Sequence, residues 1–249
     1  MDASTYNSAI YRSGGKLNGT YYGLFDSRIK KIVGTLSGTE GVLLDIGCGD
    51  GTITMQLKKT LGCEVKAVDL IQKNVDMVKK LGIPAKQVDL NRDRLPFKDG
   101  SIDCVFAGEI LEHVVDSEGL LLEIGRVLRG GGTLLLTVPN VANWYNRLIM
   151  LFGYLPHYIE SGSRKSYGTP FGKINGHVKA FTKRSIVEML EENGFGVDTV
   201  SGTGFAKTRM EEYEKGLLKF GKKLFFVAER ILSKKSGLAT NIIIKAHKI

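Results

Sequence analysis

The sequence predicts an α/β fold built on a doubly wound, mostly parallel sheet. Three observations support this prediction. A strand, a glycine turn and a helix follow one another over residues 42–61, further short apolar runs alternate with amphipathic stretches, and several apolar runs end in an acidic residue. A chain of 249 residues fits one enlarged α/β domain, and we expect a single domain over 1–249.

The first predicted strand lies at 42–46 and is followed by alternating glycines at positions 47, 49 and 51. An apolar run of this length, flanked by glycines, is typical of a buried strand in a parallel sheet. Glycines permit positive φ angles and let a ligand approach the bare backbone. Apolar residues recur in the next stretch, so a helix is expected over 52–61.

The glycine turn differs from two common nucleotide-binding motifs. A dinucleotide fingerprint reads G-x-G-x-x-G, whereas this turn reads G-x-G-x-G with Thr52 next. A Walker A loop is absent from the turn, since no Gly-Lys-Ser/Thr follows it. Asp45 and Asp50 flank the turn, and two carboxylates would repel a pyrophosphate. They suit a ligand that carries an ammonium or a sulfonium group.

The other elements are predicted from apolar periodicity and from residues that typically start or end a helix. Ser37-Gly38 ends the helix expected at 22–36, and Thr182 is the N-cap of the helix expected at 182–193. Further strands are expected at 64–70, 85–88, 102–107, 133–138, 195–201 and 240–246, and further helices at 22–36, 72–81, 120–128, 182–193 and 209–235.

Four stretches together resemble the class I S-adenosylmethionine (SAM) dependent methyltransferases. Leu43–Gly51 looks like the first motif of that family, and Ala67–Leu70, Val88–Leu90 and Phe106–Val114 fall where later motifs are expected. The resemblance covers most of 40–200 and is closest to the broad type 11 and type 23 branch, which includes ubiquinone-pathway O-methyltransferases. It implies a Rossmann-like, seven-stranded sheet with an antiparallel last strand, and SAM as the cofactor.

Three segments depart from the minimal fold. Residues 1–39 are expected to form an N-terminal arm and helix. Long insertions are usually lids or binding loops, so we interpret 141–181 as a cap over the acceptor, with a packing elaboration or dimer contact as the alternative. Residues 205–238 are expected to form a basic amphipathic helical insertion. Such a helix can lie on a membrane surface, shape an apolar acceptor pocket or simply pack on its own domain.

Acidic residues stand at four consecutive strand ends, namely Asp45, Asp69, Asp89 and Glu109. Open parallel sheets bind ligands at these ends, where the strand order reverses. A carboxylate at Asp69 can accept both ribose hydroxyls, or cap the next helix, or do both. The resemblance implies that Asp89 takes the adenine amino group. The residues expected to hold the cofactor are Asp45, Ile46, Gly47, Cys48, Gly49, Asp69, Leu70, Asp89, Leu90 and Glu109.

An oxygen acceptor needs help in losing its proton, so a base or a metal is expected near Glu109. His113 is the first candidate for the base and His177 the second. Glu109, Glu112 and His113 share one face if the chain turns helically there. With His177 they form the alternative of a divalent metal site, which resembles metal-assisted small-RNA 2′-O-methyltransferases. Many SAM enzymes carry Glu-His at this point without a metal, and no metal is our prediction.

Taken together, the sequence predicts a cytoplasmic methyltransferase acting on oxygen of a small-molecule, glycan or lipid-linked acceptor. The net charge of +9 permits anionic partners, so an RNA 2′-O-methyltransferase and a non-catalytic SAM-binding or membrane-surface module stay as alternatives. Three cysteines without metal or disulfide spacing suit a reducing compartment, and residues 1–5 lack the features of a signal peptide. The sequence does not identify the acceptor or the oligomeric state. It also does not decide between methylation of oxygen, nitrogen and carbon.

Overall fold

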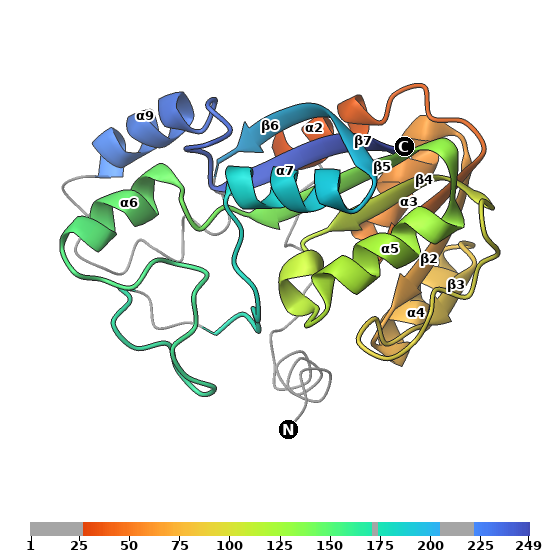
Figure 1. Ribbon diagram of the computed structural model, residues 1–249, viewed down its shortest axis with the longest axis horizontal. Coiled ribbons are helices and arrows are strands. Elements are labelled where there is room, and N and C mark those ends of the chain that lie inside the picture. Colours follow the sequence, from red (N-terminus) through yellow and green to blue (C-terminus); the bar gives the residue numbers. More distant parts are fainter. Residues whose placement is uncertain (1–26, 171–173, 205–221) are drawn as a thin grey trace.

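The computed structural model describes residues 27–170, 174–204 and 222–249. The predicted arm at 1–21 and the stretch 205–221 of the predicted amphipathic insertion lie outside these residues. The described part of the chain is organised around one seven-stranded sheet (Figure 1).

The strand order in the sheet is β3-β2-β1-β4-β5-β7-β6. Strands β1 to β5 are parallel to their neighbours, whereas β7 is antiparallel to both β5 and β6. This confirms the predicted mostly parallel sheet with an antiparallel last strand. The strands are β1 Val42–Ile46, β2 Glu64–Asp69, β3 Ala85–Gln87, β4 Ile102–Gly108, β5 Leu128–Pro139, β6 Phe195–Thr203 and β7 Asn241–Lys248.

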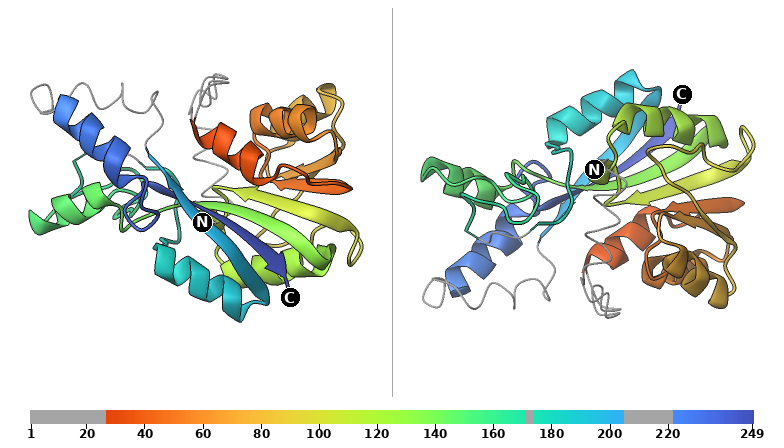
Figure 2. Two further views of the ribbon diagram at one scale, coloured as in Figure 1. Left: turned by 90° about the horizontal axis from the view of Figure 1, so that it is seen from above. Right: turned by 90° about the horizontal axis from the view of Figure 1, so that it is seen from below.

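Helices cover both faces of the sheet, as a doubly wound fold requires. Helices α2, α3 and α4 lie on one face, and α5 and α7 lie on the other (Figure 2). Each face has its own apolar core, one around Leu57 and Val75 and one around Leu121 and Ile186. The helices are α2 Ser27–Thr35, α3 Thr52–Leu61, α4 Gln72–Lys80, α5 Ser117–Val127 and α7 Lys183–Glu192.

Two sequence-based boundaries need correction. Strand β5 begins at Leu128 rather than at 133, because Leu128 already pairs with Ile102 of β4 and the pairing resumes at Thr133 after a register shift. Gly131, with φ +68°, lies within that irregularity. The chain after β4 forms only a short 3₁₀ helix, η1 Leu111–His113, in place of an α-helical turn. Because of this second difference, Glu109 does not share a helix face with Glu112 and His113.

The predicted cap contains one helix, α6 Trp144–Leu151, and the described part of the second insertion contains α9 Lys222–Leu232. The two helices lie beyond one end of the sheet (Figure 1). Within the described ranges, no helix has the length and apolar character needed to cross a bilayer.

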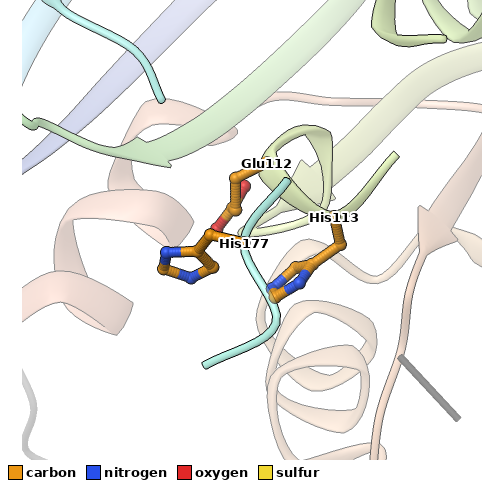
Figure 3. A group of neighbouring side chains, drawn as sticks. All are labelled: Glu112, His113 and His177. Carbon is orange, nitrogen blue, oxygen red and sulfur yellow. The ribbon is translucent and has the colours of Figure 1, made fainter. Parts of the chain in front are cut away.

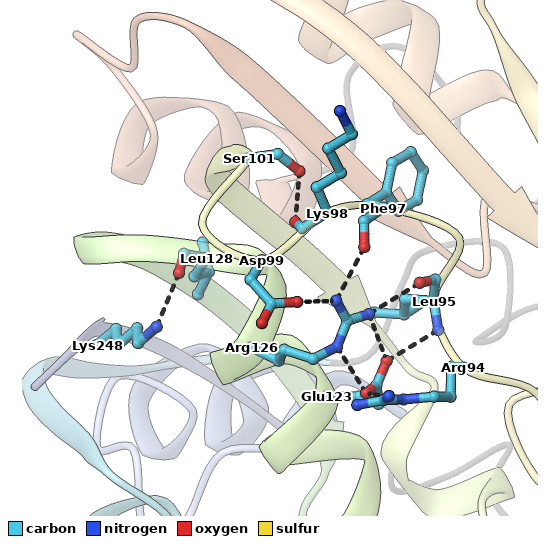
Figure 4. Close-up of polar contacts among 10 residues, drawn as sticks. All are labelled: Arg94, Leu95, Phe97, Lys98, Asp99, Ser101, Glu123, Arg126, Leu128 and Lys248. Carbon is cyan, nitrogen blue, oxygen red and sulfur yellow. Dashed lines mark hydrogen bonds and ion pairs between the residues drawn. The ribbon is translucent and has the colours of Figure 1, made fainter.

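A polar network fastens the loop after β3 to helix α5 (Figure 4). The Arg126 guanidinium donates to both carboxylate oxygens of Glu123 at 2.8 Å, and to the carbonyls of Leu95 and Phe97 at 2.9 Å. The paired Arg126 lowers the pKa of Glu123 to about 2. This network fixes the position of the loop that begins next to Asp89, at the ligand edge of the sheet.

Candidate functional site

The glycine turn after β1 is fastened to β2 by backbone hydrogen bonds. The N–H groups of Gly47 and Cys48 donate to the Val68 carbonyl at 2.8 and 3.1 Å. Gly47 has φ +77°, and an added Cβ there would lie 2.1 Å from Cδ1 of Ile110. Gly49 has φ +55°, and an added Cβ there would meet no atom within 4 Å. The open space beside Gly49 is where a ligand can approach the backbone.

Asp69 ends β2 and is 9% exposed. Its Oδ2 accepts the N–H of Gly49 at 2.8 Å, so this carboxylate also holds the glycine turn. Its Oδ1 accepts the N–H of Ile71 at 2.8 Å and the amide of Asn74 at 3.0 Å. Burial raises the pKa of Asp69, and these hydrogen bonds oppose that rise. Asp69 therefore holds the residue before α4 and the Asn74 side chain, whereas the N-cap of α4 is Ile71 and has no side-chain cap. Of the roughly four lone-pair positions of the carboxylate, one remains, on Oδ2, for a ligand hydroxyl.

Asp45 is only 2% exposed, and its Oδ2 accepts a hydrogen bond from the Thr54 hydroxyl at 2.6 Å. Burial raises the pKa of Asp45 to about 7, with a smaller contribution from the negative charge of Asp69. Without a ligand, Asp45 thus takes up a proton near neutral pH. A cationic ligand beside it would favour the ionised form.

Asp45→Asn is expected to raise the melting temperature of the ligand-free protein at about pH 8 and to leave it unchanged near pH 4. The raised pKa of about 7 means that the folded state binds this proton more tightly than the unfolded chain. The contribution of Asp45 to stability is therefore lost as pH rises through about 7. Differential scanning calorimetry at both pH values measures the effect. An equal shift at both values would contradict the assignment.

Asp89 and the two neighbouring leucines lie at the same edge of the sheet. The Asp89 carboxylate accepts the N–H of Asn91 at 3.0 Å and lies 3.7 Å from Nε of Arg92. Leu70 and Leu90 are half-buried and follow the paired ends of β2 and β3. Asp69 and Asp89 therefore stand on adjacent chain ends, because the Val88 N–H donates to the Asp69 carbonyl at 3.0 Å.

Ile46 and Cys48, which were also predicted to hold the cofactor, have side chains that are buried. The Ile46 side chain is fully buried in the core of the sheet, so only its backbone can face a ligand. Cys48 is 7% exposed, and burial raises the pKa of its thiol. The thiol is therefore neutral and is no nucleophile at neutral pH.

Glu109 directly follows β4 and lies in the left-handed region, with φ +56°. A non-glycine residue in this conformation is strained, and such strain gathers at functional sites. Its carboxylate accepts a hydrogen bond from the Thr137 hydroxyl at 3.0 Å and lies 3.4 Å from the Arg28 guanidinium. Sequence reasoning missed Arg28, which lies on α2 and approaches Glu109 only in the folded chain.

His113 and His177 come together, with ring centroids 4.9 Å apart (Figure 3). Nδ1 of His113 lies 3.0 Å from the Gly176 carbonyl. A carbonyl can only accept, so this nitrogen carries the proton and leaves Nε2 as the basic atom. Burial lowers the pKa of His113, while the Gly176 carbonyl and the charge of Glu109 partly oppose this. The His113 imidazole is therefore neutral at neutral pH.

Glu112 completes a cluster with the two histidines, and their ligand atoms all lie within 4.8 Å of one another. The side chains come from η1 and from the loop before α7, and they point toward one another (Figure 3). One carboxylate and two imidazoles are donors that suit several transition-metal ions. Glu109 lies outside this cluster, because the 3₁₀ turn and the contact with Arg28 direct it elsewhere. Three of the four residues of the alternative metal site are thus adjacent.

Glu160 positions the loop that carries His177, and sequence reasoning did not find it. Its Oε1 accepts the backbone N–H groups of Asn175, Gly176 and His177 at 2.5, 2.8 and 3.3 Å. Tyr158, in the left-handed region with φ +80°, places its carbonyl 3.4 Å from Nδ1 of His177. The same loop therefore fixes His177 directly and His113 through the Gly176 carbonyl.

Part of the chain is similar in sequence to known proteins. Residues 44–136 match the family model described as a methyltransferase domain. The chain is 38% identical over 102 residues to an uncharacterized 37.1 kDa protein in a transposon of Streptomyces fradiae, covering 39% of this chain and 30% of that protein. It is 34% identical over 103 residues to a ubiquinone biosynthesis O-methyltransferase of Xanthomonas oryzae, covering 39% of this chain and 43% of that enzyme.

The aligned region thus spans less than half the length of these two relatives. Among solved structures, a SAM-dependent methyltransferase from Archaeoglobus fulgidus superimposes with a TM-score of 0.58 at 18% identity, covering 89% of this chain and 91% of that one. A likeness at that identity shows a shared fold.

Proposed function

We propose that this chain, whose residues 44–136 match a methyltransferase domain, is a class I SAM-dependent methyltransferase that methylates an oxygen of a small-molecule, glycan or lipid-linked acceptor. The observation that carries the proposal is the placement of His113. Ile110 lies against Gly47 of the glycine turn, and the His113 N–H donates to the Ile110 carbonyl at 2.9 Å. Because Nδ1 of His113 faces the Gly176 carbonyl, Nε2 is its basic nitrogen. A neutral base beside a cofactor loop suits deprotonation of a hydroxyl.

The residues at the strand ends account for cofactor binding. Backbone groups of the glycine turn would contact the methionine part, Asp69 would accept the ribose hydroxyls, and Asp89 would take the adenine amino group. Leu70 and Leu90 would enclose the adenine ring. Each assignment follows from the position of the residue at the edge where open α/β sheets bind ligands.

The cofactor supplies an electrophilic methyl group on a positively charged sulfur. His113 Nε2 would accept the proton of the acceptor hydroxyl, and so would prepare that oxygen for the methyl group that the bound cofactor would supply. The proton then resides on the imidazole, and Glu109, a carboxylate in the same turn of chain, favours that charge. His177, edge-on to His113, limits the orientation of its ring.

A metal-assisted reaction is the second candidate, and the cluster of Glu112, His113 and His177 favours it. A bound divalent ion would stabilise an acceptor alkoxide directly. Dialysis against a chelator tests this alternative. Activity that is lost on dialysis and restored by Mn²⁺ would support the metal reading, and unchanged activity would leave His113 as the base. If the acceptor is RNA, its binding should weaken steeply with salt.

The experiment that tests the proposal is transfer of a labelled methyl group from SAM to a panel of acceptors. The panel comprises phenols, sugars, lipid-linked sugars and short RNA, and NMR of the product identifies the methylated atom. The proposal expects an O-methyl product from at least one acceptor. Transfer to nitrogen or carbon alone would contradict it.

Glu160→Gln is expected to lower kcat by about tenfold while the affinity for the cofactor product stays unchanged. A neutral amide oxygen accepts three N–H groups less strongly than a carboxylate, so the loop at 175–177 loses its fixed position. Ser163→Ala, a change at an exposed position of the same loop, is the control. A variant with wild-type kcat and an unchanged pH profile would show that Glu160 does not position the histidines.

A further inference from the structure

The outward side of α6 and the turn after it is strongly apolar. Leu148, Met150, Leu151, Phe152 and Tyr154 are between 45% and 81% exposed, with Leu151 and Phe152 the most exposed at 81% and 74%. Large apolar side chains scattered singly on a surface need no explanation, but a contiguous group of five marks an interaction surface.

Helix α9 lies against α6 and extends this surface. Phe225 packs on Trp144 and Tyr145 of α6, with ring centroids 5.0 and 5.7 Å away. The Trp144 indole N–H donates to the carboxylate of Glu229, which is 5% exposed and also accepts from the Thr240 hydroxyl. The two helices are therefore anchored to each other by buried contacts. On α9, Val227 and Ile231 remain 50% and 59% exposed.

The exposed charged side chains that the structure describes in 141–170 and 222–239 are all basic. Residues 141–170 and 222–239 contain two acidic residues, Glu160 and Glu229, and both are engaged inward with backbone or buried side-chain donors. The exposed basic side chains described in the same segments are Arg147, Arg164, Lys165, Arg230, Lys234 and Lys235. The described side chains of 141–170 and 222–239 thus combine exposed apolar groups with exposed charges of one sign.

We propose that the surface formed by α6, residues 152–154 and the outward side of α9 binds an anionic phospholipid bilayer. Apolar side chains inserted at the boundary of headgroups and acyl chains, with lysine and arginine beside them, are the usual components of interfacial binding. Nucleic acid would match the charge but leave the leucines and Phe152 without partners. A second copy of the chain would bring basic groups against basic groups.

This surface is continuous with the segment that forms the catalytic site. Helix α6 begins just after β5, and residues 157–160 return from its far end to hold His177. A membrane-bound molecule would therefore have its acceptor site close to the bilayer. This consequence, which rests on the proposed function, favours the lipid-linked class of acceptor. Bilayer binding itself does not depend on methyl transfer.

Vesicle co-sedimentation tests the proposal with the intact chain. Vesicles of phosphatidylcholine alone are compared with vesicles containing about 30% phosphatidylglycerol at low and high salt. The wild type is expected to bind the anionic vesicles at low salt. Leu151→Glu combined with Phe152→Glu should weaken binding more than about tenfold. Leu122→Glu is the matched control, because Leu122 is 61% exposed on α5, away from this surface.

A charge variant gives an independent readout. Lys234→Gln and Lys235→Gln should each weaken binding to anionic vesicles roughly fivefold at low salt. Titration with S-adenosylhomocysteine shows that every variant keeps its cofactor site, which separates failure of this surface from failure of the proposed function. Wild-type protein that does not bind anionic vesicles would overturn the proposal. A Leu151/Phe152 double variant that binds vesicles like the wild type would also overturn it. The same holds if the double variant changes the oligomeric state of the protein and leaves vesicle binding unchanged.

Discussion

Gly49→Ala is expected to weaken binding of S-adenosylhomocysteine by more than about tenfold while the protein stays folded. In the ligand-free protein, an added Cβ would meet nothing within 4 Å. The new methyl group would occupy space against the loop backbone that the cofactor needs. The left-handed backbone at φ +55° adds a cost of about 1–2 kcal/mol to stability. Calorimetric titration measures the affinity, and thermal melting measures the stability.

Gly131→Ala is the matched control for this prediction. Gly131 also has a left-handed backbone, with φ +68°, and also has open space around an added Cβ. It lies near the start of β5, away from the C-terminal edge of the parallel strands. Both variants should lose similar stability, and only Gly49→Ala should lose affinity. Equal affinity in the two variants would mean that the cofactor does not lie against Gly49.

His113→Ala is expected to lower kcat by about 10²–10⁴-fold and to leave binding of S-adenosylhomocysteine unchanged. The variant keeps the cofactor loop and removes the proposed base. His247→Ala is the control, because His247 is an exposed residue on β7 that contacts Asp198. A His113 variant with wild-type kcat would exclude His113 as the base.

The pH dependence of the rate gives a second test of His113. Burial lowers the pKa of this imidazole from its usual value of 6.5, so the neutral, basic form persists to a lower pH than in an ordinary histidine. The rate of the wild type should therefore fall on the acid side only below about pH 6.5. If the rate already falls at a pH well above that value, the group whose protonation lowers the rate is not His113.

Much of the fold could be predicted because the strands are short apolar runs that end in glycine or acidic residues. The central strands and the positions of Asp45, Asp69 and Asp89 depend on local pattern, which is visible in the sequence. The start of β5 at Leu128 was harder to predict, since it depends on pairing with Ile102 of β4. The same is true of the 3₁₀ helix at 111–113. Neither feature has a local periodicity.

The catalytic side of the site was only partly predictable. His113 and His177 could be named from the family resemblance, and the structure brings them within 4.9 Å. Arg28 and Glu160 were missed, since the first reaches Glu109 from a distant helix and the second acts on backbone N–H groups rather than on a motif. Contacts that join distant segments of chain leave no local signal in one sequence.

The most direct test of the central claim is calorimetric titration of the wild-type protein with S-adenosylhomocysteine. The geometry of the glycine turn, Asp69 and Asp89 predicts saturable binding to one site with an affinity on the order of micromolar. The same titration on Asp69→Ala should lose most of this binding, since the ribose acceptor is removed. Well-folded wild-type protein that shows no binding would contradict the assignment of this site as a SAM site.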